Sequence, residues 1–189
     1  APLQGGNKAE FLDATQATAT VIANTFLEIS SSEVLGAHRG FINIDYGLLF
    51  SDVLEALPRD QVVLEILENI EPTPDVIKRC QELRSMGFTL AVDDIVHAKE
   101  TYAPLFKLAD VIKIDIMGMS RPVLVRLVND LRAYGKQLLA EKVETLEQYK
   151  FCKQLGFDLF QGYYFAKPTI IVGKKLNPSQ LVLMRLMGL

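Results

Sequence analysis

Short apolar segments alternate with longer amphipathic segments along most of this 189-residue chain. The apolar segments are β-branched or rich in leucine, and they lack a clean alternation of apolar and polar positions. That pattern is typical of strands that are buried on both faces, as in parallel sheets. It predicts six strands, which span residues 41–44, 62–66, 89–92, 111–114, 137–140 and 158–161.

The segments between these strands carry the signals of helices. Gly87, Gly135 and Gly156 each stand where a helical pattern ends and a strand follows, which is where a left-handed backbone is needed. Proline or capping signals predict helix starts at 73–74, 120–122 and 145–148. The expected helices span 75–86, 123–134 and 146–155, with a shorter one near 48–57 and a weaker one near 99–108.

Alternating strands and helices indicate an α/β fold with a parallel sheet and right-handed crossovers. The evenness of the repeat favours a (β/α)8 barrel of the TIM type, and an open doubly wound sheet is the structural alternative. Six strands do not complete eight, and the chain opens with a helical stretch at 14–29 that no strand precedes. We therefore expect the first strand of the barrel to be missing from this fragment.

Composition narrows the class of protein. The net charge is −3, with 20 basic and 23 acidic residues, which does not suit a binder of nucleic acid polymers. No apolar run approaches the roughly 20 residues that span a bilayer, and no secretory signal is visible. Cys80 and Cys152 lie far apart in helical patterns, so buried free thiols are favoured over a disulfide and a reducing cytoplasm is the simplest compartment.

Polar side chains recur at or near the ends of the predicted strands. Charged groups at the ends of apolar strands are costly to place unless they converge on a site. Parallel strands whose carboxyl ends share one face supply such a site, and carboxylate and amide oxygens suit hard divalent cations. The pattern predicts a metal-dependent active site built from Asn43, Glu65, Asp93, Asp94, Lys113 and Glu141.

The same segments resemble the ordered motifs of the EAL domain family, bacterial phosphodiesterases that open the cyclic dinucleotide c-di-GMP. FINID, LEILE, AVDDI, IKID, AEKVET and FQGYYFAKP occur in the order and with the spacing of that family, across nearly the whole chain. The resemblance implies metal ligands at Asn43, Glu65, Asp93 and Asp94. It also points to Glu68 as the companion of Glu65 in the motif E-[LI]-T-E. Its other motifs match at Lys113, Asp115, Glu141, Glu144, Gln161, Gly162 and Pro168. In particular, AEKVET resembles the family's A-E-G-V-E-T.

The chemistry of these residue types fits phosphodiester hydrolysis to linear pGpG. Two Mg²⁺ or Mn²⁺ ions about 3.5–4 Å apart clamp the attacking and leaving oxygens in such sites, and two adjacent aspartates are a natural bridge between them. Lys113 is expected to stabilise phosphate charge or to orient the attacking water, and Glu141 to assist its deprotonation. Glu144 and Gln161 are expected to order Lys113, or to bind substrate and hydration water.

Each of these residues also has an ordinary structural interpretation. Asp93 and Asp94 alone are compatible with a helix N-cap, and Lys113 alone with a solvated strand end or a Schiff-base lysine. Glu68 and Glu71 are expected in a solvated loop rather than at the metals. His38 and His97 are expected at the surface. Tyr163, Tyr164 and Phe165 are expected to pack at the core or rim rather than to stack on bases.

The sequence also departs from the family's pattern. The Glu-Ala-Leu segment that names the family is absent and is expected before residue 1, and IVHAKETYAPL replaces the usual F-G-T-G after Asp94. In the family that loop is tied to dimer contacts and to order at the metal site. The alternative function is therefore a catalytically degenerate module that binds nucleotide or a partner protein. We expect the fragment itself to be weakly active or inactive.

The C-terminal part resembles the subgroup in which an HDOD domain follows. The segment QLVLMRLMGL is apolar nearly all round, with Arg185 as its one charge, so a helix there needs burial against something. We expect residues 1–173 to form the barrel domain and residues 174–189 to lead into an HDOD-like domain. A homodimer is a further expectation, because dimers are common in the family.

Overall fold

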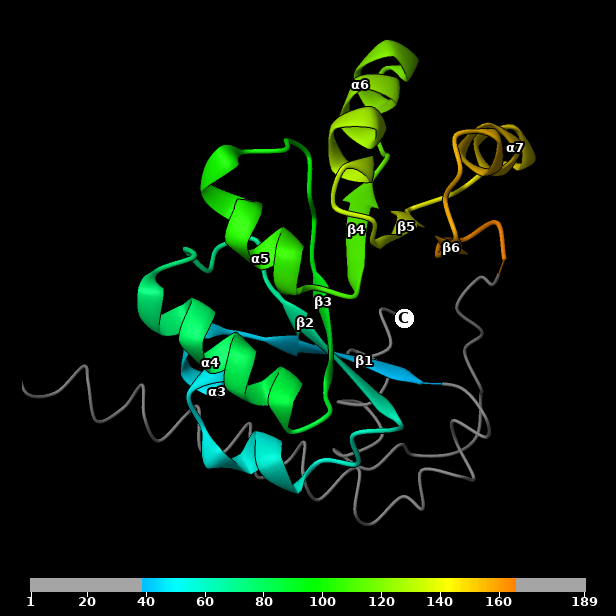
Figure 1. The fold of residues 1–189 in the computed structure, drawn as a ribbon. Coiled ribbons are helices and arrows are strands. Elements are labelled where there is room, and N and C mark those ends of the chain that lie inside the picture. The colour runs from blue at the N-terminus through cyan, green and yellow to red at the C-terminus, as the bar shows by residue number, and fades with distance from the viewer. Residues whose placement is uncertain (1–38, 166–189) are drawn as a thin grey trace, which may run out of the picture.

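The computed structural model describes residues 39–165, and its six strands form one curled, parallel sheet (Figure 1). Each strand pairs with the next strand in the sequence, so the strand order never reverses within the described residues. An order without reversal is that of a (β/α) barrel, whereas a doubly wound sheet needs a switch point. The barrel prediction is confirmed. The strands are β1 (Gly40–Ile44), β2 (Val62–Ile66), β3 (Thr89–Val92), β4 (Val111–Asp115), β5 (Gln137–Glu141) and β6 (Leu159–Phe160).

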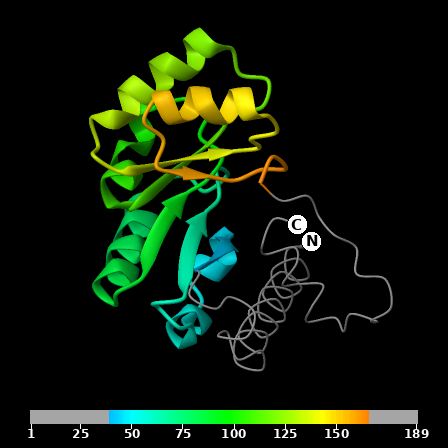
Figure 2. The same ribbon diagram turned by 90° about the vertical axis from the view of Figure 1, so that its right-hand side faces the viewer.

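The helices lie along the outer face of the curled sheet (Figure 2). They are α3 (Tyr46–Leu49), α4 (Pro74–Ser85), α5 (Ala103–Leu108), α6 (Arg121–Arg132) and α7 (Leu146–Gln154), with 3-10 turns η1 (Asp52–Ala56) and η2 (Glu100–Tyr102). The helix expected near 48–57 is instead divided into α3 and η1. Ser51 separates the two, because its backbone is extended and its hydroxyl accepts a bond from the Val53 N–H.

The predicted helix ends are confirmed by their geometry. The Thr73 hydroxyl accepts a bond from the Val76 N–H, and the reciprocal bonds of a capping box join Thr145 and Gln148. The glycines that follow α4, α6 and α7 have φ values of 97°, 63° and 84°. A left-handed backbone of this kind is unfavourable for a residue with a Cβ, which is why these helices stop where the sequence predicts.

The sheet has an apolar layer on each face. The residues that face the helices form the main core, which includes Ile42, Leu64, Leu90, Ile112 and Leu138. The opposite, inner face carries a second apolar cluster. Its members are Phe41, Val63, Ala91, Val111, Leu139 and Leu159, one from each strand.

Two positions after each member of this apolar cluster, the inner face becomes polar. Side chains alternate between the faces of a strand, so residues i and i+2 point the same way. The next inner positions are therefore Asn43, Glu65, Asp93, Lys113, Glu141 and Gln161. The fold thus gathers six polar residues that are far apart in the sequence at the carboxyl ends of the strands, on top of an apolar floor.

Several sequence-based predictions lie outside the described residues. These are the helix at 14–29, the missing first strand, His38, Pro168 and the C-terminal segment 174–189. Across residues 39–165, every helix is too short or too polar to cross a membrane.

Candidate functional site

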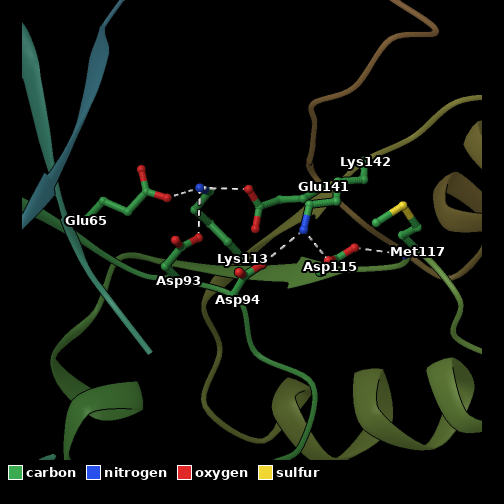
Figure 3. A network of polar contacts seen from close by, with 8 residues as sticks. All are labelled: Glu65, Asp93, Asp94, Lys113, Asp115, Met117, Glu141 and Lys142. Atoms are coloured by element: carbon green, nitrogen blue, oxygen red, sulfur yellow. Dashed lines mark hydrogen bonds and ion pairs between the residues drawn. The ribbon is translucent and has the colours of Figure 1, made fainter. Parts of the chain in front are cut away.

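Lys113 of β4 lies among three carboxylates at the end of the sheet, and we call these four residues the inner cluster (Figure 3). Its Nζ is 2.9 Å from Oδ1 of Asp93 and 2.8 Å from Oε1 of Glu141, and it also contacts Oε1 of Glu65. All four residues are buried, with exposed fractions between 3% and 9%. Strands β2, β4 and β5 and the residue directly after β3 therefore each contribute one charged group to a single buried point.

The inner cluster carries more negative than positive charge, because three carboxylates surround one ammonium. Burial raises the pKa of Glu141 to about 7, although Lys113 beside it acts in the opposite direction. Burial also raises the pKa of Asp93 and lowers that of Lys113. In addition, Oε2 of Glu141 is buried without a hydrogen-bond partner. A buried site with excess negative charge and a free acceptor oxygen is suited to a cation.

A second group of charges lies beside the first, and we call Asp94, Asp115 and Lys142 the outer cluster (Figure 3). Nζ of Lys142 contacts Oδ2 of Asp115 and lies 3.8 Å from Oδ1 of Asp94. Asp115 also accepts a bond of 2.8 Å from the Met117 N–H. Burial raises the pKa of Asp94, as does the neighbouring charge of Asp93, while the bond to Asp115 raises the pKa of Lys142.

Two sets of carboxylates come close enough to share a cation. One set is Glu65, Asp93 and Glu141, and the other is Glu68, Asp93 and Asp94; within each set, one oxygen of every residue lies within 4.8 Å of the others. Asp93 belongs to both sets. The donors are all oxygens, which is the chemistry that Mg²⁺, Mn²⁺ and Ca²⁺ prefer, so the described residues fit hard divalent cations.

The remaining predicted residues lie around these clusters. Asn43 is exposed and pairs in register with Glu65 on the neighbouring strand. Gln161 is half-buried after β6, where its N–H donates to the Ala140 carbonyl. Glu144 is exposed at the start of α7, and its N–H donates to Oε1 of Gln148. The side-chain partners of Lys113 are the three inner carboxylates, so Glu144 does not order it in the described residues.

Sequence reasoning underestimated two residues. Glu68 is exposed, as expected of a solvated loop, yet one of its oxygens reaches Asp93 and Asp94. Lys142 was not singled out, although the family motif A-E-G-V-E-T has glycine at its position. That mismatch was the available signal, because Lys142 has a φ of 55° that glycine adopts at less cost.

Other predictions about individual side chains agree with the structure. His97 is exposed, and both cysteines are buried and free. Tyr164 and Phe165 pack at the rim against Tyr149, with ring centroids 5.9 Å and 5.5 Å from that of Tyr149, whereas Tyr163 is 55% exposed.

A hollow of about 460 Å³ adjoins the loop that follows Asp94. Residues 96–99 of that loop form one side, and the other side is α6, from Pro122 to Asp130. Val96 and Val123 are nearly half exposed there, at 46% and 47%.

The chain matches the EAL domain family over residues 12–168. Among curated proteins, it is 36% identical over 181 residues to the cyclic di-GMP phosphodiesterase CdgJ of Vibrio cholerae, covering 94% of this chain and 41% of that protein. The chain thus spans about two fifths of the length of that relative.

Solved structures agree on the fold. The PaMucR phosphodiesterase in complex with c-di-GMP is similar with a TM-score of 0.68 at 21% identity, over 86% of this chain and 80% of that one. BlrP1 of Klebsiella pneumoniae, solved with cyclic di-GMP and manganese, has a TM-score of 0.61 at 26% identity, over 80% of this chain and 44% of that one. BlrP1 has also been solved with cyclic di-GMP and calcium.

Proposed function

The chain is a member of the EAL domain family, and from this premise we propose that it is a metal-dependent phosphodiesterase domain that hydrolyses c-di-GMP to linear pGpG. The observation that carries the proposal is the inner cluster. Three buried carboxylates around one ammonium leave net negative charge and a free acceptor oxygen at the carboxyl ends of parallel strands. Stability alone does not explain such a group, since apolar residues are often equally stabilising at buried positions.

We propose that Asn43, Glu65, Asp93 and Asp94 would hold the cations, with Mg²⁺ or Mn²⁺ as the working metals. When bound, the cations neutralise the non-bridging phosphate oxygens and lower the pKa of a water molecule. Asp93 belongs to both sets of carboxylates, so it would contribute a ligand to a cation held at either set. The exposed amide of Asn43, beside Glu65, supplies a neutral oxygen at the open edge of the site.

Residues of the chain itself would stabilise the negative charge on the phosphate and accept the proton of the attacking water. Lys113 is held in place from three sides, so its ammonium is already oriented to stabilise charge on the phosphate at little entropic cost. The oxygen of water would bond to phosphorus while the bond from phosphorus to one ribose 3′ oxygen breaks. Glu141 would take the proton of the water, and the released 3′ oxygen would take up a proton from solvent to become the 3′-hydroxyl of pGpG. A pKa of about 7 suits Glu141 to that role near neutral pH. Gln161 and Glu144 would contact the nucleotide from the edge of the site.

The direct test is turnover of c-di-GMP with Mn²⁺ and with Mg²⁺, with pGpG measured by chromatography. Glu141→Gln is expected to lower the rate by about 10²–10⁴-fold, the usual loss of a general base. Glu147→Gln is the matched control, because Glu147 is an exposed carboxylate on α7, and it is expected to leave the rate unchanged. Equal rates in the two variants would contradict the role of Glu141.

Binding without turnover would instead support the second candidate, a degenerate module that acts as a nucleotide receptor. The observation that favours it is that two lysines already lie beside carboxylates that cations would need. Lys113 contacts Glu65, and Nζ of Lys142 is 3.8 Å from Oδ1 of Asp94. The 189-residue chain should be assayed beside any longer protein that contains it, and the prediction is that the chain alone is slower. A longer protein that binds c-di-GMP but turns over none would overturn the enzyme proposal.

We also propose a homodimer through the hollow beside the loop after Asp94, since the exposed side chains of Val96 and Val123 both line it. Val123→Glu is expected to shift a dimer to monomer in sedimentation experiments. Leu146→Glu, at an equally exposed apolar position on α7, should not. A wild-type chain that is monomeric at high concentration would exclude this interface.

The boundary of the domain is proposed from the sequence. The all-round apolar pattern at the C-terminus supports a barrel domain over 1–173 and a connection over 174–189 to an HDOD-like domain. A cytoplasmic location is proposed as well, because the buried cysteines are free thiols, which suits a reducing compartment.

A further inference from the structure

Lys142 combines an unusual backbone with an unusual contact. Among the described residues, Asp94 and Lys142 are the non-glycine residues with positive φ, at 46° and 55°. Asp94 follows β3 and Lys142 follows β5, and the two side chains meet over the end of β4, which lies between those strands (Figure 3). Two strained turns therefore bring one ammonium to one carboxylate.

The backbone at position 142 does not require lysine. A left-handed turn is most easily made by glycine, and a side chain with a Cβ adds a conformational cost there. Lys142 is 43% exposed, and exposed ion pairs add little to stability. Neither the turn nor stability accounts for a lysine at this position. The remaining distinctive feature is the positive charge that Lys142 places beside Asp94 and Asp115.

That charge lies beside one of the two sets of possible metal donors. Asp94 shares the set with Glu68 and Asp93, and Nζ of Lys142 is 3.8 Å from Oδ1 of Asp94. A cation bound to Asp94 would therefore lie near the ammonium, and like charges at such distances repel appreciably even in a partly solvated environment. The inner set meets a different lysine, Lys113, which lies deep in the site.

We propose that Lys142 is an intramolecular counter-ion of Asp94 and Asp115 that opposes binding of a divalent cation to the set formed by Glu68, Asp93 and Asp94. The ammonium occupies the electrostatic position beside Asp94 that a cation would otherwise use. Cation binding at this set then has to displace or outweigh it. Lys142 thereby makes this set the weaker of two cation positions. This inference deepens the proposed function and rests on it, because it assumes that the carboxylates bind metal.

The test measures metal binding rather than turnover. Mn²⁺ is titrated into the full chain without nucleotide, and free Mn²⁺ is followed by electron paramagnetic resonance. Lys142→Ala is expected to tighten the weaker Mn²⁺ site roughly tenfold, or to make it detectable where the wild type shows one site. Lys142→Arg keeps the charge and is expected to retain the weak binding of the wild type.

Two further variants separate the charge from other effects. Lys150→Ala removes the same charge from the exposed face of α7 and is expected to leave both Mn²⁺ affinities unchanged. Lys142→Gly removes the charge and also relaxes the left-handed backbone. It should bind Mn²⁺ about as well as Lys142→Ala. If only Lys142→Gly tightens binding, the backbone and not the charge is responsible, and the inference is overturned.

The outcomes also distinguish this inference from the proposed function. If the wild type binds Mn²⁺ and Lys142→Ala binds it with the same affinities and number of sites, the counter-ion role is wrong and the metal site stands. If neither protein binds Mn²⁺, both proposals fail. If Lys142→Arg behaves like Lys142→Ala, the positive charge is not what weakens the site, and the counter-ion role is again wrong.

Discussion

The inner and outer clusters share the ends of strands β3, β4 and β5, yet they place their lysines in opposite environments. In the inner cluster, the ammonium of β4 faces carboxylates from β2, from β5 and from the residue after β3. In the outer cluster, the ammonium that follows β5 faces carboxylates from β4 and from the second residue after β3. The Lys113 side chain is 4% exposed, whereas that of Lys142 is 43% exposed. Burial makes the first ammonium a fixed part of the fold, while the second is free to exchange with solvent and ions. The ion pairs of Lys113 are therefore a fixed part of the fold, whereas those of Lys142 can break and re-form in exchange with solvent ions.

The largest difference between the two clusters should appear when each loses its ammonium and the free energy of unfolding is compared. Lys113→Met leaves three buried carboxylates without their cation, so the free energy of unfolding is expected to fall by about 3–5 kcal/mol in the presence of a chelator. Lys142→Ala is expected to change it by less than about 1 kcal/mol. Urea denaturation of both variants beside the wild type measures the difference. Similar losses in the two would mean that burial does not distinguish the clusters.

The next largest effect should be a pH dependence of the free energy of unfolding that originates in the inner cluster. The pKa of Glu141 rises from 4.5 to about 7 on folding, so the folded state holds its proton more tightly than the unfolded state. Tighter proton binding at Glu141 therefore adds at most about 3 kcal/mol to the free energy of unfolding. This contribution is fully present below pH 4.5 and is lost as the pH rises through about 7. The raised pKa of Asp93 acts in the same direction.

Urea denaturation in chelator at a series of pH values measures this slope. Glu141→Gln should make the decline of stability with pH shallower, because the variant lacks the titrating group. An unchanged slope in Glu141→Gln would show that the decline arises elsewhere.

Metal binding should stabilise the chain through the same carboxylates. At a Mn²⁺ concentration one hundred times the dissociation constant, the free energy of unfolding is expected to rise by about 2.7 kcal/mol. Asp93→Asn should abolish most of that gain, since Asp93 belongs to both sets of donors. Asp115→Asn should retain it, since Asp115 belongs to neither set. Urea denaturation with Mn²⁺ and with chelator supplies the comparison. If Asp115→Asn is no longer stabilised by Mn²⁺, Asp115 must be counted among the metal ligands.

The smallest effect is expected from the outer cluster on its own. Asp115→Asn removes the charge that Lys142 contacts but keeps an oxygen for the Met117 N–H. Without metal, the free energy of unfolding should change by less than about 1 kcal/mol, as for other exposed ion pairs. A larger loss in urea denaturation would mean that the outer cluster also helps to hold the barrel closed.

Much of the fold could be predicted because its signals are local. The predicted strands match the observed ones to within one residue at each end, since buried parallel strands are short apolar runs bounded by turn residues. The helix starting at Thr73 and the capping box at Thr145 depend on neighbouring residues alone. The division of 48–57 at Ser51 was missed, because the apolar periodicity continues across Ser51 and outweighed the N-cap preference of serine.

The candidate site could be predicted only in part. Polar residues at the strand ends indicated which side chains share a face, and Glu65, Asp93, Lys113 and Glu141 do meet. The reach of Glu68 to Asp93 and of Lys142 to Asp94 depends on loop conformation instead. Loops have no repeating pattern from which such distances follow.

The sequence by itself determined the alternation of strands and helices, the helix ends and the set of polar inner positions, because each follows from periodicity or from contacts between near neighbours. The tertiary structure alone decided which lysine is buried. Lys113 and Lys142 are the same residue type, and the first lies within β4 while the second directly follows β5. The curl of the sheet closes three carboxylates around the first, and a left-handed turn carries the second to the open edge of the site.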